Sequence, residues 1–386
     1  MKDSGDQTLE IYIHIPFCIK KCAYCDFLSG PASVSRQNLY LRALTREIRE
    51  RKDGTGRRVS SVFIGGGTPS VLSGEQLLPV MEAVRETFTV LPEAEITIEA
   101  NPGTLDREKL AAYRRMGINR LSIGLQSAKD DLLKKLGRIH DYETFVKTWL
   151  LAREEGFRNC NVDLMFAIPG QSPEDWQATL RTVAALSPEH ISAYSLIVEP
   201  GTPFAGMDLA LPDEDTEYAM YEDTARILGE YGYRQYEISN YARDGFACRH
   251  NIGYWQRKEY LGFGLGAASL FKEVRYRNTV DPDTYSRVWG EDGAVPDRRT
   301  AGQYEEVTPL TEPDRMAEFM FLGLRMTEGV SGQAFEQQFG KPLTAVYGPV
   351  IDKYRSLGLL AEENGRILLT RPGIHVSNTI MADFLL

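Results

Sequence analysis

Apolar, strand-like runs alternate with amphipathic, helix-like stretches along the first half of this sequence, and this alternation constrains the fold most. The pattern occurs six times between residues 11 and 196, with short connections. It predicts an α/β fold of parallel strands joined by right-handed helical crossovers. Since a closed barrel of this type needs eight units, six units favour a partial, TIM-like (βα)6 barrel. We expect strands at 11–16, 59–64, 95–99, 120–124, 161–166 and 190–196, and helices at 35–52, 73–87, 106–116, near 130, 142–155 and 173–185.

Polar or bare-backbone positions lie at the ends of successive expected strands. A cysteine-containing loop follows the first strand and three glycines follow the second, while Glu99 closes the third. Gln126 follows the fourth strand and Asp163 lies within the fifth. Because the carboxyl ends of parallel strands meet at one rim, these groups are expected to form one site.

The cysteine loop carries Cys18, Cys22 and Cys25 in the spacing C-x3-C-x2-C. Three thiolates can hold three irons of a cubic iron-sulfur cluster, which leaves the fourth iron open to a small ligand. The amine and carboxylate of S-adenosylmethionine (SAM) form a chelate of suitable size. Two alternatives are a structural zinc site, which usually has four ligands, and a disulfide, which would leave one of the five cysteines over.

Length and charge limit the other classes of function. With 386 residues the chain can form one domain of barrel size and a smaller one, and its net charge of -10 does not favour nucleic acid. The polar opening residues contain no signal peptide, and no apolar run approaches a membrane span, so a cytoplasmic protein is expected.

The glycine run at 65–67 has two interpretations. It lacks the Gly-Lys-Ser/Thr of a phosphate-binding loop and the third glycine of a dinucleotide fingerprint. Bare backbone at Gly66 and Gly67 could approach the methionyl amine of SAM, where a side chain would intrude. The alternative is an ordinary tight turn.

Five motifs together give the chain a resemblance to the radical SAM family of oxygen-independent coproporphyrinogen III oxidase-like proteins. They are YIHIPFC at 12–18, GGGTP at 65–69, IEANP at 98–102, GLQS at 124–127 and VDLMFAIPGQ at 162–171. The resemblance implies that the three cysteines bind a [4Fe-4S] cluster and that a set of further residues contacts SAM. That set is Tyr12, Tyr24, Gly66, Gly67, Thr68, Glu99, Gln126, Arg138 and Asp163.

Two departures distinguish the branches of this family. The oxidase branch has a further cysteine two residues after the third cluster ligand and a longer N-terminal extension. This chain has Phe27 at that position and seventeen residues before Cys18. Both features instead match the HemW branch, whose members are regarded as haem chaperones.

A second motif fits the same branch. His250, Asn251, Tyr254 and Trp255 resemble the haem-associated HNxxYW motif, and a neutral imidazole is a common ligand of haem iron. The alternative for His250 is an ordinary hydrogen-bonded histidine. For Cys248 a small buried thiol is favoured over an iron ligand.

We expect three parts of the chain: the barrel at 1–210, an extension and linker with the HNxxYW motif at 211–308, and a C-terminal domain at 309–386. Residues 213–231 look helical and 272–308 loop-rich. The last part reads as helices with one hairpin turning at Asn364 and Gly365, similar to a winged helix and covering the open side of the barrel.

The leading hypothesis is a haem chaperone that passes haem to an acceptor apoprotein at a membrane, with an electron donor reducing its cluster. The alternative is a coproporphyrinogen III oxidase that uses SAM cleavage for hydrogen abstraction. A third is a zinc-binding module. The sequence leaves open whether SAM is cleaved or only bound, and whether the chain forms a dimer.

Overall fold

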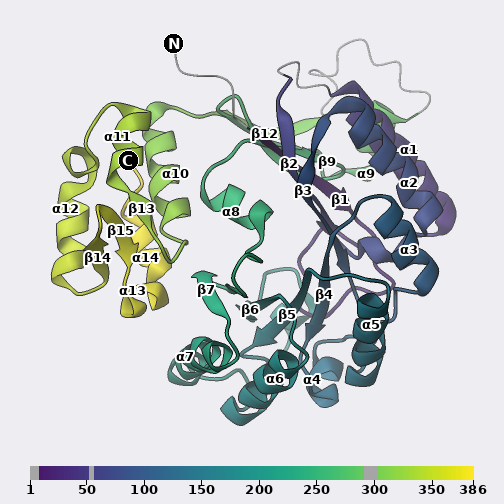
Figure 1. The fold of residues 1–386 in the computed structure, drawn as a ribbon, viewed down its shortest axis with the longest axis horizontal. Coiled ribbons are helices and arrows are strands. Elements are labelled where there is room, and N and C mark those ends of the chain that lie inside the picture. The colour runs from purple at the N-terminus through teal and green to yellow at the C-terminus, as the bar shows by residue number, and fades with distance from the viewer. Residues whose placement is uncertain (1–7, 52–55, 291–302) are drawn as a thin grey trace.

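The computed structural model describes residues 8–51, 56–290 and 303–386. Six parallel strands form the centre of its main sheet and neighbour one another in chain order (Figure 1). The expected partial barrel of strand–helix units is confirmed. The strands are β1 (Leu9–Ile15), β2 (Arg58–Gly66), β3 (Thr89–Ala100), β4 (Arg120–Gln126), β5 (Cys160–Phe166) and β6 (His190–Ser195).

Helices cover the outer face of these strands, along the right and lower edges of Figure 1. Local chemistry sets their starts: Ser73 and Gln76 form a reciprocal capping box, and Ser172 with Asp175 does the same. The helices are α1 (Val34–Glu50), α2 (Gly74–Thr87), α3 (Arg107–Arg115), α4 (Asp130–Lys135), α5 (Tyr142–Glu154) and α6 (Pro173–Ala185), with short 3-10 turns at Pro69–Val71 and Pro203–Gly206.

The sheet extends beyond the six expected strands at both edges. On one edge β9 (Tyr260–Phe263) pairs parallel to β1, followed by antiparallel β10 (Ala268–Phe271), β11 (Val274–Asn278) and β12 (Tyr304–Pro309). The other edge carries β8 (Asn240–Ala242) and β7 (Arg234–Glu237), after helix α7 (Glu214–Glu230).

The expectation that 272–308 is loop-rich is wrong for the described residues of that range, which contain β11, α9 (Pro282–Trp289) and the start of β12. Strands β11 and β12 lack an apolar alternation because they are the outermost pair of the sheet and carry charged side chains that pair with each other. Arg277 lies 3.3 Å from Glu305 and 2.8 Å from Glu306. Residues 291–302 lie outside the described chain.

Helix α8 (Arg249–Trp255) packs against β2, between the strands and the C-terminal part of the chain (Figure 1). It carries the HNxxYW motif. Its residue Gly253 lies against the Glu10 side chain of β1, where a Cβ atom would come within 2.0 Å of Glu10 Oε1.

The C-terminal part builds a second apolar core around Phe335, Tyr347 and Phe384. Asn364 and Gly365 take positive φ values of 51° and 73°, as the expected two-residue hairpin turn requires. The elements are α10 (Glu312–Gly323), β13 (Val330–Ser331), α11 (Gly332–Phe339), α12 (Leu343–Ser356), β14 (Leu360–Glu363), β15 (Arg366–Leu369), α13 (Arg371–His375) and α14 (Ser377–Ala382).

Backbone hydrogen bonds join this part to the barrel at β7. Ile238 N–H donates to the Arg325 carbonyl at 3.1 Å, and Thr327 N–H donates to the Tyr236 carbonyl at 3.0 Å. Figure 1 shows the C-terminal elements on the left, on the side of α8 rather than of α1 and α2. The smaller, mainly helical C-terminal domain is therefore confirmed.

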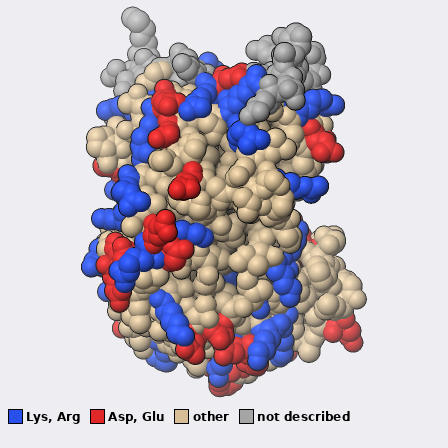
Figure 2. Space-filling model, turned by 90° about the vertical axis from the view of Figure 1, so that its right-hand side faces the viewer, with Lys and Arg blue, Asp and Glu red and all other residues tan. Residues whose placement is uncertain are grey.

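Charges of both signs are interspersed on the surface. Figure 2 shows a broad area with few charged side chains across the middle of one face, with Lys, Arg, Asp and Glu gathered above and below it. Among the helices of the described chain, none combines the length and apolarity needed to traverse a lipid bilayer.

Candidate functional site

A cavity of about 380 Å³ lies at the carboxyl ends of the central strands. Its walls come from the loop after β1 and from the ends of β2 to β6, as the strand-end pattern predicts. Most of the site residues expected from sequence line it: Cys18, Cys22, Cys25, Tyr24, Gly66, Gly67, Thr68, Glu99, Gln126, Arg138 and Asp163.

The three cysteines lie on a loop that closes on itself. Cys18 N–H donates to the Gly30 carbonyl at 3.0 Å, and Gly30 N–H donates to the Pro16 carbonyl at 3.1 Å. All three thiols are half-buried and face the cavity, whereas the two other cysteines, Cys160 and Cys248, are buried elsewhere. The loop thus offers three sulfur ligands to one cavity.

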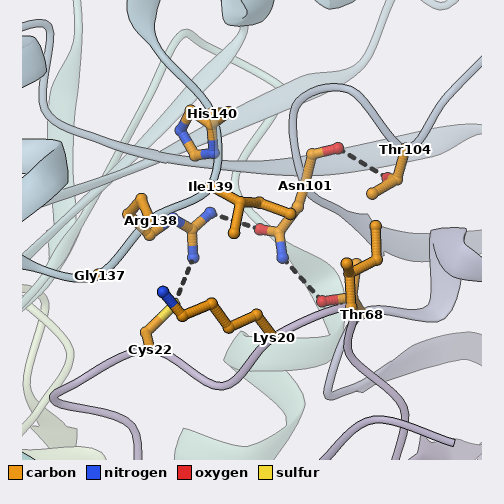
Figure 3. A pocket seen from close by; sticks show the side chains of 10 residues that line it. Lys20, Cys22, Thr68, Asn101, Thr104, Gly137, Arg138, Ile139 and His140 are labelled. Atoms are coloured by element: carbon orange, nitrogen blue, oxygen red, sulfur yellow. Dashed lines mark hydrogen bonds between the residues drawn. The ribbon is translucent and has the colours of Figure 1, made fainter.

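Hydrogen-bond donors point at two of these sulfurs, and Figure 3 shows the contact of Arg138 with Cys22. Arg138 Nη1 lies 3.5 Å from Cys22 Sγ, and Thr68 Oγ1 lies 3.5 Å from Cys18 Sγ. Asn101 connects the two donors, since its Oδ1 accepts from Arg138 Nη2 at 2.6 Å and its Nδ2 donates to Thr68 Oγ1 at 2.7 Å. Such donors favour thiolates, the form of cysteine that binds metal.

Both glycines of the predicted set are required by the packing of the protein itself. Gly66 has a φ of +111°, and a Cβ there would lie 2.5 Å from the ring of His14. A Cβ on Gly67 would lie 2.6 Å from the Phe17 carbonyl oxygen. Close packing within the protein therefore accounts for both glycines, and their bare backbone also lines the cavity.

Two carboxyl groups stand together at the cavity floor. Glu99 Oε2 accepts from Gly66 N–H at 3.0 Å, and burial together with nearby Asp163 raises the pKa of Glu99 to about 8. Burial also raises the pKa of Asp163, although hydrogen bonds from Asn161 and Ser122 oppose this. A cation placed between the two carboxyl groups would offset the cost of ionising both.

Gln126 lies in the left-handed region of backbone space, with a φ of +74°. The register between β4 and β5 shifts at this point, between Gly124 and Gln126. A residue other than glycine in this region has a strained backbone, and such strain is concentrated at functional sites in proteins. The bulge turns the Gln126 side chain into the cavity wall.

The structure does not bring Tyr12 or His250 into the cavity lining. Tyr12 donates its hydroxyl proton to His14 Nδ1 at 3.0 Å, because His14 Nε2 donates to the Leu28 carbonyl, and the Tyr12 ring stacks on Phe63. His250 is 1% exposed, and its Nδ1 lies 2.8 Å from Ser61 Oγ. Burial lowers the pKa of His250 to about 3, so its imidazole is neutral.

Sequence reasoning missed Asn101 and Ser122, which both line the cavity. Asn101 follows directly on β3, so the strand-end rule contained the signal. Ser122 precedes Gly124 by two residues on β4, and the period of two along a strand places both on one face.

Two family models match separate parts of the chain. The Radical SAM superfamily model matches residues 12–183, and the model of the HemN C-terminal domain matches residues 310–376. The heme chaperone HemW of Bacillus subtilis is 37% identical over 380 residues, which are 97% of this chain and 98% of that protein. This chain belongs to the HemW family.

Other members of the family give the same result. The heme chaperone HemW of Lactococcus lactis is 35% identical over 97% of both chains, and that of Escherichia coli is 41% identical over 67% of this chain and 69% of its own. Among solved structures, the coproporphyrinogen III oxidase HemN of Escherichia coli matches with a TM-score of 0.85 and 26% identity, over 98% of this chain and 90% of that chain.

Proposed function

We propose that this protein binds haem and transfers it to acceptor proteins, on a radical SAM scaffold with one [4Fe-4S] cluster and SAM. The observation that carries the proposal is a strand-end cavity with three cysteines, beside a 62% exposed Phe27 where the oxidase branch has a further cysteine. The chaperone names of the HemW relatives support it.

The residues of the cavity fit the two cofactors. Cys18, Cys22 and Cys25 would hold three irons, while the Arg138 guanidinium suits a carboxylate and the acids Glu99 and Asp163 suit an amine or ribose hydroxyls. Arg138 Nε is buried without a hydrogen-bond partner, so the guanidinium retains a donor. When bound and reduced by an electron donor, the cluster supplies an electron for SAM cleavage.

His250 is proposed as a residue of the haem site. Its Nε2 is buried and has no hydrogen-bond partner. The same motif supplies an aromatic neighbour, Tyr254, whose ring centroid lies 4.6 Å from that of His250. Because His250 is 1% exposed, haem iron would reach its Nε2 only after α8 has moved.

Haem titration tests the proposal. We expect wild type and a His375→Ala control to bind haem with equal affinity, whereas His250→Ala binds it at least about tenfold more weakly, as expected for loss of an iron ligand. A Cys18/Cys22/Cys25 triple alanine variant, with 5′-deoxyadenosine measured in parallel, separates haem binding from cluster chemistry. Equal affinity in wild type and His250→Ala would remove His250 from the haem site.

The likeness to HemN over nearly the whole chain favours one other function, the conversion of coproporphyrinogen III to protoporphyrinogen IX. An anaerobic turnover assay with reduced, cluster-loaded protein decides between the two. Conversion at a rate comparable to that of an oxidase would replace the chaperone proposal.

The proposal includes a setting for this activity. The protein would act in the cytoplasm on an acceptor apoprotein at a membrane, without a role for nucleic acid, and sedimentation in the presence of haem would show whether it dimerises. The division at 1–210, 211–308 and 309–386 is part of the proposal. The separate apolar core of the C-terminal part supports its last boundary, whereas the barrel core continues across residue 210 as far as Trp289.

A further inference from the structure

A continuous chain of buried and partly buried hydrogen bonds runs from α8 to the cavity. Cys248 N–H, at the start of α8, donates to the Tyr236 hydroxyl at 3.3 Å. That hydroxyl lies 2.8 Å from His190 Nε2, and His190 Nδ1 lies 2.6 Å from Asn161 Oδ1. Asn161 Nδ2 then donates to Asp163 Oδ1, on the cavity wall, at 2.8 Å.

Every donor in this hydrogen-bond chain points from α8 toward the cavity. Asn161 Oδ1 can only accept, so His190 carries its proton on Nδ1, and its Nε2 accepts from the Tyr236 hydroxyl, whose oxygen accepts from Cys248 N–H. Burial keeps this imidazole neutral by lowering its pKa well below the usual value. The chain therefore ends on the acceptor that completes it, the Asp163 carboxylate.

One buried cation lies among the same groups. Arg120 is 2% exposed and interacts electrostatically with Cys248 and Glu95 near α8 and with Asp163 at the cavity. Glu95 Oε1 in turn accepts from His250 N–H at 3.3 Å and from Cys248 Sγ at 3.3 Å. A change of charge or position at Asp163 thus acts on groups that hold α8.

We propose that this hydrogen-bond chain couples ligand binding in the cavity to the seating of α8, so that SAM and haem oppose each other's binding. The inference rests on the proposed function for the identity of the two ligands. It assigns Tyr236 and His190 as positioning residues, since neither lines the cavity.

The sign of the coupling follows from the groups at the two ends of the hydrogen-bond chain. A ligand that donates to Asp163 keeps this carboxylate ionised, which favours the aligned chain and holds α8 in place. Haem requires the opposite, because His250 is buried while α8 is seated. Coupling between two sites is reciprocal, so SAM weakens haem binding by the same factor by which haem weakens SAM binding.

The first experiment is a haem titration of cluster-loaded protein with and without saturating SAM. In wild type we expect SAM to raise the haem Kd about tenfold, within the usual range of coupling between sites. Tyr236→Phe removes the hydroxyl and should bring the factor below about two. Tyr233→Phe is the matched control, because it removes a buried hydroxyl that donates to the Pro188 carbonyl outside the chain.

Three outcomes overturn the coupling. In the first two, SAM leaves the haem Kd of wild type unchanged or lowers it. In the third, SAM raises the haem Kd of Tyr236→Phe by the same factor as that of wild type. If wild type binds no haem at all, the proposed function fails instead, and the second experiment decides the coupling without haem.

The second experiment measures hydrogen exchange of the α8 amides in the ligand-free protein. Asp163→Asn replaces the terminal acceptor by a group that also donates, and exchange at residues 252–255 should become at least about fivefold faster. Asp175→Asn, which alters a partly exposed capping carboxylate on α6 that pairs with Lys129, should leave α8 unchanged. Equal α8 exchange in wild type and Asp163→Asn overturns the coupling whatever the haem result.

Discussion

Arg138 joins the cysteine loop to the strand ends. It contacts the Cys22 sulfur, the Asn101 side chain and the Gly124 carbonyl at once, from a loop position after α4. A planar guanidinium can serve several acceptors in fixed directions, which an ammonium cannot.

We expect Arg138→Lys to weaken SAM binding by about tenfold or more, because the charge is kept while the forked contacts are lost. Equilibrium dialysis of SAM against cluster-loaded protein measures this. Lys135→Arg on α4 is the control and should bind as wild type does. Wild-type affinity in Arg138→Lys would exclude a directional role for the guanidinium.

Glu10 gives a prediction about pH. Burial raises its pKa in the folded protein to about 8 from an ordinary value of 4.5. Between these two values the folded protein binds more protons than the unfolded chain, so Glu10 lowers the free energy of unfolding as pH rises. The loss in free energy of unfolding caused by Glu10 is small near pH 5 and largest at and above pH 8.

Glu10→Gln should therefore be more stable than wild type at pH 8, by about 4 kcal/mol, and within about 1 kcal/mol of it at pH 5. Urea unfolding at both pH values measures the difference, with the exposed Glu108→Gln as the control. The same gain at both pH values would show that neutralisation of Glu10 is not its cause.

Among the elements, α8 depends on a close approach to β1. A Cβ on Gly253 would lie 2.0 Å from Oε1 and 2.3 Å from Cδ of Glu10, whose side chain is itself buried beside His250. Alanine is the better helix former, yet the enclosed carboxyl group has little room to move.

Gly253→Ala should lower the free energy of unfolding by about 1–3 kcal/mol and speed hydrogen exchange in α8. Gly229→Ala on α7 is a matched helical control, because nothing lies within 4 Å of its Cβ, and it should gain about 0.5–1 kcal/mol. If Gly253→Ala were as stable as Gly229→Ala, α8 would not be seated as closely as the structure shows.

The elements also show what could be predicted from sequence. The central strands and helices were predictable because each has its own apolar period and caps, and the strand-end rule by itself places the cysteines beside Glu99 and Asp163. Strand β11 was not, because its segment VRYRN lacks an apolar alternation: it lies between β10 and the edge strand β12, and its Arg277 side chain pairs with Glu305 and Glu306. The burial of His250 was not predictable either, since it depends on where α8 enters the barrel.

At the scale of the whole molecule, the barrel core and the C-terminal core share no residue. The two parts touch through polar contacts, among them the backbone bridge of Met326 with Glu237 and the ion pair of Arg257 with Glu318. This arrangement supports separate unfolding of the C-terminal part. Phe384 lies in the second core, fully buried and 5.2 Å from the Tyr347 ring.

Phe384→Ala should destabilise the second core by about 3–5 kcal/mol through loss of contact and creation of a cavity. Hydrogen exchange should then accelerate in α12 and β15 and stay unchanged in β4 and β5, because no side chain of the barrel core lines the space that Phe384 would vacate. Leu386→Ala, at a residue 63% exposed, is the control and should alter neither region. Equal acceleration in β4 and α12 would mean that the two cores unfold as one unit, and the division of the chain near residue 309 would then have no counterpart in its stability.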